Sequence, residues 1–131
     1  NNKETNRKYS DSRLSQRALR EIYLRAFEII VREEQPWAIM SSYNVMNGRR
    51  ASESRELLTD ILRDEWGYTG MVMTDWWTRG EHYKEILAGN DLKMANGYPE
   101  RVREAMRHGV VTRSDLTACA IRILALVLRI E

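Results

Sequence analysis

The sequence predicts an α/β fold in which about three parallel strands alternate with helices, in a barrel or an open sheet. Three short runs have the length of buried strands, at residues 37–43, 71–74 and 91–94. The segments between them repeat apolar residues at helical spacing. Strands that alternate with helices are joined by right-handed crossovers, so neighbouring strands are expected to be parallel.

The first helix is expected to follow a polar loop, residues 1–12, and to end near Glu34. Its apolar residues are interleaved with charged ones, as in an amphipathic helix. These apolar residues are Leu14, Ala18, Ile22, Phe27, Ile29 and Ile30. Pro36 ends the segment because proline cannot continue the helical hydrogen-bond ladder. The strand at 37–43 starts apolar and ends polar, so we expect it to deliver Tyr43 to a loop.

The second helix follows a turn marked by Asn47-Gly48. Ser52 or Ser54 can cap this helix, and Gly67 is a natural stop. Its apolar residues recur at helical spacing and are Leu57, Leu58, Ile61, Leu62 and Trp66. The strand at 71–74 comes next.

Three further helices are expected in the second half of the chain. Residues 81–88 form a short helix that Gly89 closes, and proline in the first turn introduces the helix at 99–108. The spacing of Thr112 and Asp115 is that of a capping box, which predicts a last helix as far as Ile130.

Composition indicates at most one ordinary globular domain. The 131 residues include 21 basic and 19 acidic ones, mixed along the chain, so neither nucleic acid nor an anionic membrane is an expected partner. Lysines and arginines fall on helix faces and are expected to be solvated. The single cysteine, Cys119, excludes an internal disulfide and is expected to be a buried, small apolar side chain.

No segment has the length of a membrane span, since the apolar run from Ile121 to Ile130 is too short. The chain begins with Asn1 rather than methionine, so a targeting segment upstream is compatible with the sequence. Neither a cytoplasmic nor a secreted location is assigned.

Asp75 is the strongest candidate for chemistry, because it directly follows the strand at 71–74, and the carboxyl ends of parallel strands often carry active sites. Trp76 and Trp77 follow it, and aromatic rings beside a carboxylate are a common way to hold a sugar. A structural role, with Asp75 as a cap or ion-pair partner and the tryptophans as packing, fits the pattern equally well. Tyr43 should lie on the same rim, where its phenol can hydrogen-bond the carboxylate.

Other residue types give little signal for a site. On pattern alone, Arg7 is expected to be solvated and Met40 to lie in the core. His82 and His108 fall on helices without a second ligand at metal spacing, so we expect surface histidines, no metal and no cofactor. There is no Gly-rich phosphate loop and no glycine-flanked serine elbow.

Five blocks of the sequence occur in one order with consistent spacing and extend over nearly the whole chain. They are Asn1 to Arg7, Arg17 to Glu28, Ser42 to Gly48, Leu57 to Gly67 and Thr74 to Trp76. Together they resemble glycoside hydrolase family 3, in its β-glucosidase and β-xylosidase branch. The resemblance implies a partial (β/α)8 TIM-type barrel. Because a whole barrel needs roughly 250 residues, residues 1–131 would be a C-terminal portion of that catalytic domain.

The same resemblance implies a retaining β-glycosidase. Asp75, in a Thr-Asp-Trp motif where the family usually has Ser-Asp-Trp, would be the nucleophile that attacks the anomeric carbon. Arg7 would bind sugar hydroxyls, Met40 and Tyr43 would line the first sugar subsite, and Trp76 would pack against the sugar ring.

Part of the machinery is expected outside this chain. The resemblance implies a Lys-His pair before Asn1 and a general acid/base glutamate after Glu131, since a retaining mechanism needs two carboxylates about 5 Å apart. The isolated chain is therefore expected to be inactive. Its expected partners are a β-linked oligosaccharide or glycoside ending in glucose or xylose, and the remainder of the parent chain. It is also expected to self-associate through exposed strand edges.

The alternative is a non-catalytic remnant of the same barrel, which binds sugar through Trp76, Trp77 and Tyr43 without hydrolysing it.

Overall fold

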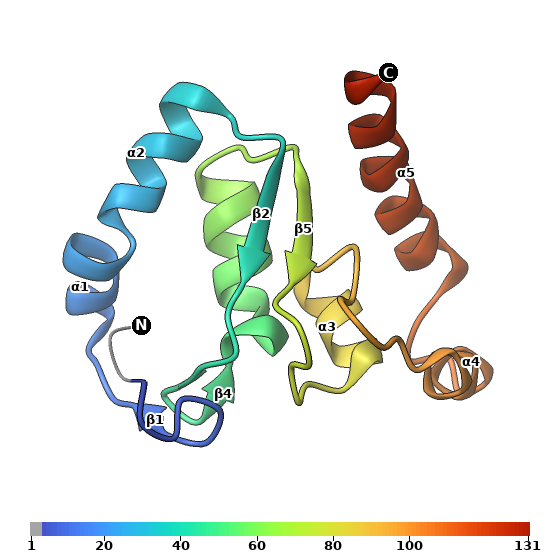
Figure 1. The fold of residues 1–131 in the computed structure, drawn as a ribbon, viewed down its shortest axis with the longest axis horizontal. Coiled ribbons are helices and arrows are strands. Elements are labelled where there is room, and N and C mark those ends of the chain that lie inside the picture. Colours follow the sequence, from blue (N-terminus) through green and yellow to red (C-terminus); the bar gives the residue numbers. More distant parts are fainter. Residues whose placement is uncertain (1–3) are drawn as a thin grey trace.

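The computed structural model describes residues 4–131, so the Asn1–Lys3 part of the first block lies outside it. It shows the predicted α/β fold, in which parallel strands alternate with helices. Strands β2 (Ala38–Ser41) and β5 (Met71–Thr74) pair in parallel, and Figure 1 shows both arrows pointing the same way. The loops that follow the two strands therefore leave from one end of the sheet. The predicted third strand is reduced to one parallel bridge between Met73 and Leu92.

The first helical segment agrees with its predicted limits but not with its predicted buried face. It consists of α1 (Gln16–Ala18), a π-helical turn η1 (Leu19–Tyr23) and α2 (Arg25–Glu34). Leu19 and Val31 are buried, whereas the predicted face is largely exposed, at Ile22, Phe27, Ile29 and Ile30. The π-turn explains the difference, because its i→i+5 bonds insert extra residues and rotate the following side chains around the axis.

Four further helices begin and end close to the predicted residues. They are the π-helix η3 (Glu56–Glu65) and the α-helices α3 (His82–Ala88), α4 (Pro99–Arg107) and α5 (Arg113–Ile130). A short 3-10 turn, η2 (Ala51–Glu53), precedes η3 and was not predicted. Gly89 ends α3 with a φ of 117°, a conformation that glycine adopts without strain. At the start of α5, Thr112 and Asp115 form the predicted capping box.

A small second sheet lies in the segment expected to be loop and turn. It contains β1 (Asp11–Ser12), β3 (Val45–Met46) and β4 (Arg49–Arg50), with β1 parallel and β4 antiparallel to β3. The turn Asn47-Gly48 joins β3 to β4 with positive φ at both residues, as tight hairpins require. Strands of two residues show no alternation in sequence, which is why only the turn was predictable.

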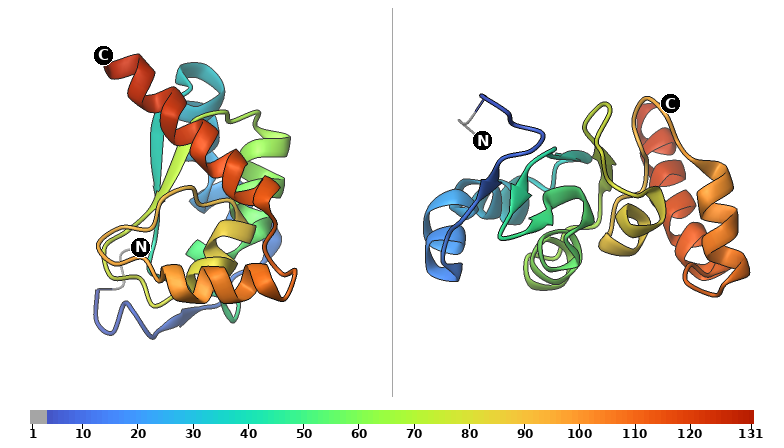
Figure 2. Two further views of the ribbon diagram at one scale, coloured as in Figure 1. Left: turned by 90° about the vertical axis from the view of Figure 1, so that its right-hand side faces the viewer. Right: turned by 90° about the horizontal axis from the view of Figure 1, so that it is seen from below.

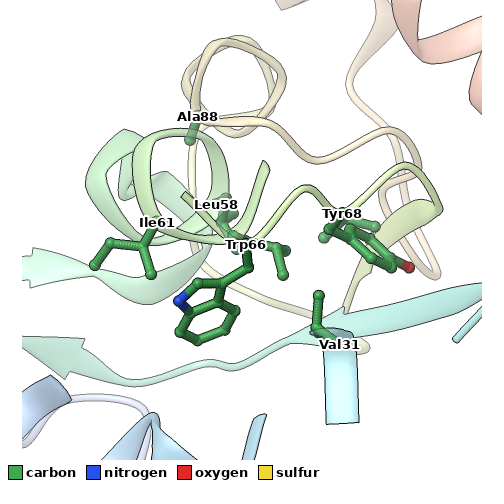
Figure 3. Packing of buried hydrophobic residues seen from close by; sticks show 8 residues of the cluster. Val31, Leu58, Ile61, Trp66, Tyr68 and Ala88 are labelled. Carbon is green, nitrogen blue, oxygen red and sulfur yellow. The ribbon is translucent and has the colours of Figure 1, made fainter. Parts of the chain in front are cut away.

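The hydrophobic core lies between the strand pair and the helices. Its buried members are Val31, Leu58, Ile61, Leu62, Trp66, Tyr68, Val72 and Ala88, which come from α2, η3, β5, α3 and the η3–β5 loop (Figure 3). In the right-hand view of Figure 2, η3 and α3 lie on one side of the two strands, and α4 lies beyond α3, which it contacts.

The face of the strand pair that points away from the core carries the side chains that alternate with the core residues. Ile39 packs against the core, so its neighbour Met40 points away from the core and is 49% exposed. Met40 pairs with Met73, and the alternation places Asp75 on this same face. Among residues 4–131, no helix combines the length and apolar character needed to cross a membrane.

Candidate active site

Asp75 lies one residue beyond β5, at the end of the sheet where the loop after β2 also begins (Figure 1). The hydrogen-bond ladder reaches past the strand, because the Asp75 N–H donates to the Ser41 carbonyl at 3.0 Å. Thr74 is fully buried; its N–H donates to the Leu92 carbonyl at 2.9 Å and its hydroxyl accepts from the Met94 N–H at 3.0 Å. Hydrogen bonds with Ser41 on one side and with Leu92 and Met94 on the other thus fix the backbone around residue 75. The Asp75 side chain itself is partly exposed.

The Asp75 carboxylate contacts the backbone of Trp76 and interacts with the phenol of Tyr43. The Trp76 N–H donates to Asp75 Oδ1 at 2.6 Å. Burial, and then the neighbouring Asp75 carboxylate, raise the pKa of Tyr43, and the Arg7 charge opposes this effect. The phenol therefore stays protonated at neutral pH and is able to donate a hydrogen bond to the carboxylate.

The other predicted site residues lie around this pair. The Arg7 guanidinium carbon is 5.1 Å from the centre of the Tyr43 ring, and Arg7 forms an exposed ion pair with Glu4 at 2.9 Å. Met40 is not in the core, contrary to the pattern-based expectation, because it faces the open side of the strand pair. Trp76 is partly exposed.

The structure therefore brings Arg7, Tyr43 and Asp75 into one chain of contacts. Met40 lies on the same face of the strands, and Trp76 follows Asp75 directly. Their roles toward a substrate stay predictions.

A buried ion pair behind the β5–α3 loop did not emerge from the sequence. Lys93 Nζ donates to Glu85 Oε2 at 2.5 Å, to Thr78 Oγ1 at 3.1 Å and to the Gly80 carbonyl at 3.1 Å. Glu85 Oε1 accepts from the hydroxyls of Ser52 at 3.0 Å and Thr78 at 2.7 Å. Both charged side chains are almost completely buried, so the loop that begins at Asp75 is anchored at its far end.

A second buried carboxylate, Asp91, joins two helices to β5. Its Oδ2 accepts from Arg63 Nη2 at 3.0 Å and from the Val72 N–H at 2.8 Å, and its Oδ1 accepts from Arg122 Nε at 2.7 Å. The expectation that lysines and arginines are solvated is therefore wrong for Lys93, Arg63 and Arg122. Polar residues inside a predicted buried strand, here Asp91 and Lys93, were the sequence signal for these pairs, since buried charges need partners.

His82 also departs from the expected surface position. It is half-buried, and burial is the first cause that lowers its pKa. Its Nδ1 accepts a hydrogen bond from the Tyr98 N–H at 3.2 Å. Within residues 4–131, no three acidic, histidine or cysteine side chains come close enough together to hold a metal ion.

Comparisons with known proteins agree with the sequence resemblance. The model of the N-terminal domain of glycosyl hydrolase family 3 matches residues 2–126. Beta-glucosidase A of Butyrivibrio fibrisolvens is 62% identical over 116 residues, which are 88% of this chain and 14% of that protein. The exo-alpha-(1->6)-L-arabinopyranosidase of Bifidobacterium longum is 46% identical over 92% of this chain and 16% of its own length.

A solved structure shows the same fold. The GH3 beta-glucosidase of Bifidobacterium adolescentis superimposes with a TM-score of 0.92 at 45% identity, over 97% of this chain and 19% of that one. The chain therefore spans less than a fifth of the length of each of these relatives.

The matched domain corrects one expectation. The resemblance implied a C-terminal portion of the catalytic barrel domain, whereas the match is to the N-terminal domain of the family's proteins. Because that domain matches almost all of the sequence, the chain belongs to glycosyl hydrolase family 3, as part of its N-terminal domain.

Proposed function

We propose that this chain supplies the nucleophile and part of the first sugar subsite of a retaining β-glycosidase. The observation that carries the proposal is the position of Asp75, at the carboxyl end of a parallel strand and beside the Tyr43 phenol, in a chain of this family. The full-length parent would hydrolyse terminal β-linked glucose or xylose. Glucose is the first choice because the most identical of the relatives described above is a β-glucosidase.

The proposed reaction begins with attack of the Asp75 carboxylate on the anomeric carbon. The bond to the leaving oxygen breaks as that oxygen takes a proton from a general acid, and a covalent glycosyl-enzyme forms. Water activated by the same residue then releases the sugar and frees Asp75. The acid/base would be a glutamate elsewhere in the parent protein.

The surroundings of Asp75 suit this role. The Trp76 N–H holds Oδ1 at 2.6 Å, which orients the carboxylate and leaves Oδ2 for attack. The Tyr43 phenol stays protonated beside this carboxylate and would donate a further hydrogen bond to it.

The sugar ring would lie against side chains on the open face of the strand pair. Trp76 is partly exposed and offers an aromatic surface for the apolar face of a ring. Met40 would contact the same ring, since half of its surface is exposed on this face. Arg7 would bind sugar hydroxyls, because its exposed ion pair with Glu4 contributes little and is easily exchanged.

Residues 1–131 would be one portion of the barrel domain, with the remaining strands supplied by the rest of the parent chain. The open face and the strand edges of the isolated chain are then incomplete parts of a larger sheet. For this reason, and because the acid/base lies elsewhere, the isolated chain should be inactive.

The test uses the full-length parent protein and a 2-deoxy-2-fluoro-β-glucosyl fluoride, which forms the covalent intermediate but hydrolyses slowly. Mass spectrometry should find the added sugar on the peptide that contains Asp75. Asp75→Ala should abolish both labelling and turnover of an aryl β-glucoside. Asp60→Ala removes an exposed carboxylate of the same type and serves as the matched control.

Label on another peptide, or undiminished turnover in Asp75→Ala, would refute the nucleophile assignment. A parent that binds glucose in calorimetry but neither labels nor turns over substrate would instead support the binding-only alternative.

A further inference from the structure

Lys8 places a second cation against the Tyr43 ring, in addition to the one that Arg7 provides. Its Nζ is 5.1 Å from the centre of the ring, the same distance as the Arg7 guanidinium carbon. A cation within about 6 Å of an aromatic ring centre is attracted by the negative face of the ring. The family resemblance assigns a role to Arg7 but none to Lys8.

The backbone at Lys8 is fixed by a strand and by a turn. Arg50 Nη1, from β4, donates to the Lys8 carbonyl at 3.3 Å. The Tyr9 N–H donates to the Asn6 carbonyl at 2.8 Å, which closes a turn that contains Lys8. Lys8 is consequently only partly exposed, and these contacts determine where its side chain starts toward Tyr43.

The two cations differ in how far their charge is neutralised. Arg7 forms an ion pair with Glu4 at 2.9 Å. Among residues 4–131, by contrast, no carboxylate forms an ion pair with Lys8, whose ammonium instead faces the Tyr43 ring. The lysine charge therefore acts on the ring without a local counter-ion.

Tyr43 connects this charge to Asp75. Burial, and then the neighbouring Asp75 carboxylate, raise the pKa of Tyr43, so the phenol stays protonated close to that carboxylate. Within residues 4–131, the charged groups that face Tyr43 are Asp75, Arg7 and Lys8, and Glu4 acts on it only through Arg7. A cation over the ring polarises the phenol and makes its O–H a stronger donor. A carboxylate that accepts a stronger hydrogen bond is stabilised in its charged form.

We propose that Lys8 is a positioning residue that acts through the Tyr43 phenol to keep the Asp75 carboxylate ionised in acidic solution. Lys8 polarises the phenol, the phenol stabilises the carboxylate, and the ionised carboxylate is the form that attacks the anomeric carbon. Arg7 has a different task, because it is proposed to bind sugar hydroxyls. The inference rests on the proposed function, since it assumes that Asp75 is the nucleophile.

The test is the pH dependence of kcat/KM for an aryl β-glucoside, measured with the full-length parent. The acid limb of this profile reports protonation of the nucleophile in the free enzyme. Because Lys8 favours the charged form, Lys8→Met should move the acid limb to higher pH. A cation–π contact at an exposed site changes an equilibrium roughly two- to fivefold, so the expected movement is about half a pH unit. The loss of kcat/KM should be largest below the acid limb and smaller above it.

Three further variants identify the cause of the movement. Lys8→Arg keeps a cation that stacks on aromatic rings, so it should restore most of the wild-type profile. Lys84→Met is the matched control, since Lys84 Nζ is 5.9 Å from the centre of the Tyr83 ring on α3, and it should leave the acid limb unmoved. Tyr43→Phe keeps the ring but removes the hydroxyl, so Lys8→Met should move the acid limb much less in this background.

An unmoved acid limb in Lys8→Met would overturn the inference, and so would an equal movement in Lys84→Met, which would show a general effect of charge. An equal fall in kcat/KM at every pH would show a structural role for Lys8 instead. A full movement in the Tyr43→Phe background would refute the route through the phenol.

Labelling by the 2-deoxy-2-fluoro sugar tests the proposed function separately. With the label on Asp75, an unmoved acid limb refutes the inference alone. Without that label, the proposed function fails and the inference fails with it.

Discussion

Replacing Lys93 with methionine should destabilise the protein strongly, because it leaves the Glu85 carboxylate buried without its cation. The Lys93 and Glu85 side chains are 3% and 1% exposed. Removing one partner of a buried ion pair costs about 3–5 kcal/mol. Glu85 keeps two of its hydrogen-bond donors, the hydroxyls of Ser52 and Thr78, so we expect the lower end, about 3 kcal/mol.

The double variant Lys93→Met/Glu85→Leu tests the cause of this loss. It removes both charges, and apolar replacement of a buried pair is often neutral or stabilising. In the double variant the hydroxyls of Ser52 and Thr78 lose their acceptor, which costs about 1 kcal/mol each. This loss is smaller than the loss of about 3 kcal/mol expected for Lys93→Met, so the double variant should be the more stable of the two.

Urea unfolding of the full-length parent, followed by tryptophan fluorescence, provides the free energies for this cycle. Arg17→Met is the surface control, since its pair with Glu21 is highly exposed and should contribute less than about 1 kcal/mol. If Lys93→Met cost no more than this control, or if the double variant were less stable than Lys93→Met, the reasoning would be refuted.

Three other features lead to measurable expectations: the α5 cap, the buried thiol and the exposed helix faces. Hydrogen bonds from the Thr112 side chain and then its backbone lower the pKa of Asp115 in the folded state. Their stabilisation is therefore complete above the unfolded pKa of about 3.9 and is lost as pH falls through the folded value. In urea unfolding, Thr112→Ala should cost about 1 kcal/mol at pH 7 and less at pH 3, and an equal cost at both would contradict this. Burial raises the pKa of Cys119 to about 11, so a disulfide reagent at pH 8 should modify the folded protein far more slowly than the urea-unfolded protein. Equal rates would disprove burial of the thiol. The isolated chain should sediment as an oligomer, because large apolar side chains such as Phe27 and Leu128 are exposed. A monomer that melts cooperatively would be evidence against this.

The parts of the fold that the sequence predicted correctly depend on local signals. The capping box of Thr112 and Asp115 involves residues three positions apart, and Pro99 fixes the first turn of α4 by itself. The meeting of Tyr43 and Asp75 followed from one non-local rule, that parallel strands deliver their following loops to the same end of a sheet.

The features that were missed depend on contacts between distant segments. Pairing of β1 with β3 brings Asp11 opposite Val45, and two-residue strands give no periodic pattern from which to infer it. The buried face of the first helix was wrong because η1 changes the helical phase. Lys93 lies in a predicted buried strand, which was a sign of burial, but no local pattern in the sequence identifies Glu85 as its partner.

The close approach of Gly80 to Glu85 has a consequence for protein engineering. A Cβ atom at position 80 would overlap the Glu85 carboxylate. Directed evolution of substrate preference would naturally randomise the loop after β5, where Trp77 and Arg79 lie. Libraries that keep glycine at position 80 should retain many folded members, whereas those that vary it should consist mostly of misfolded ones, because a side chain there displaces the carboxylate on which the whole loop is anchored.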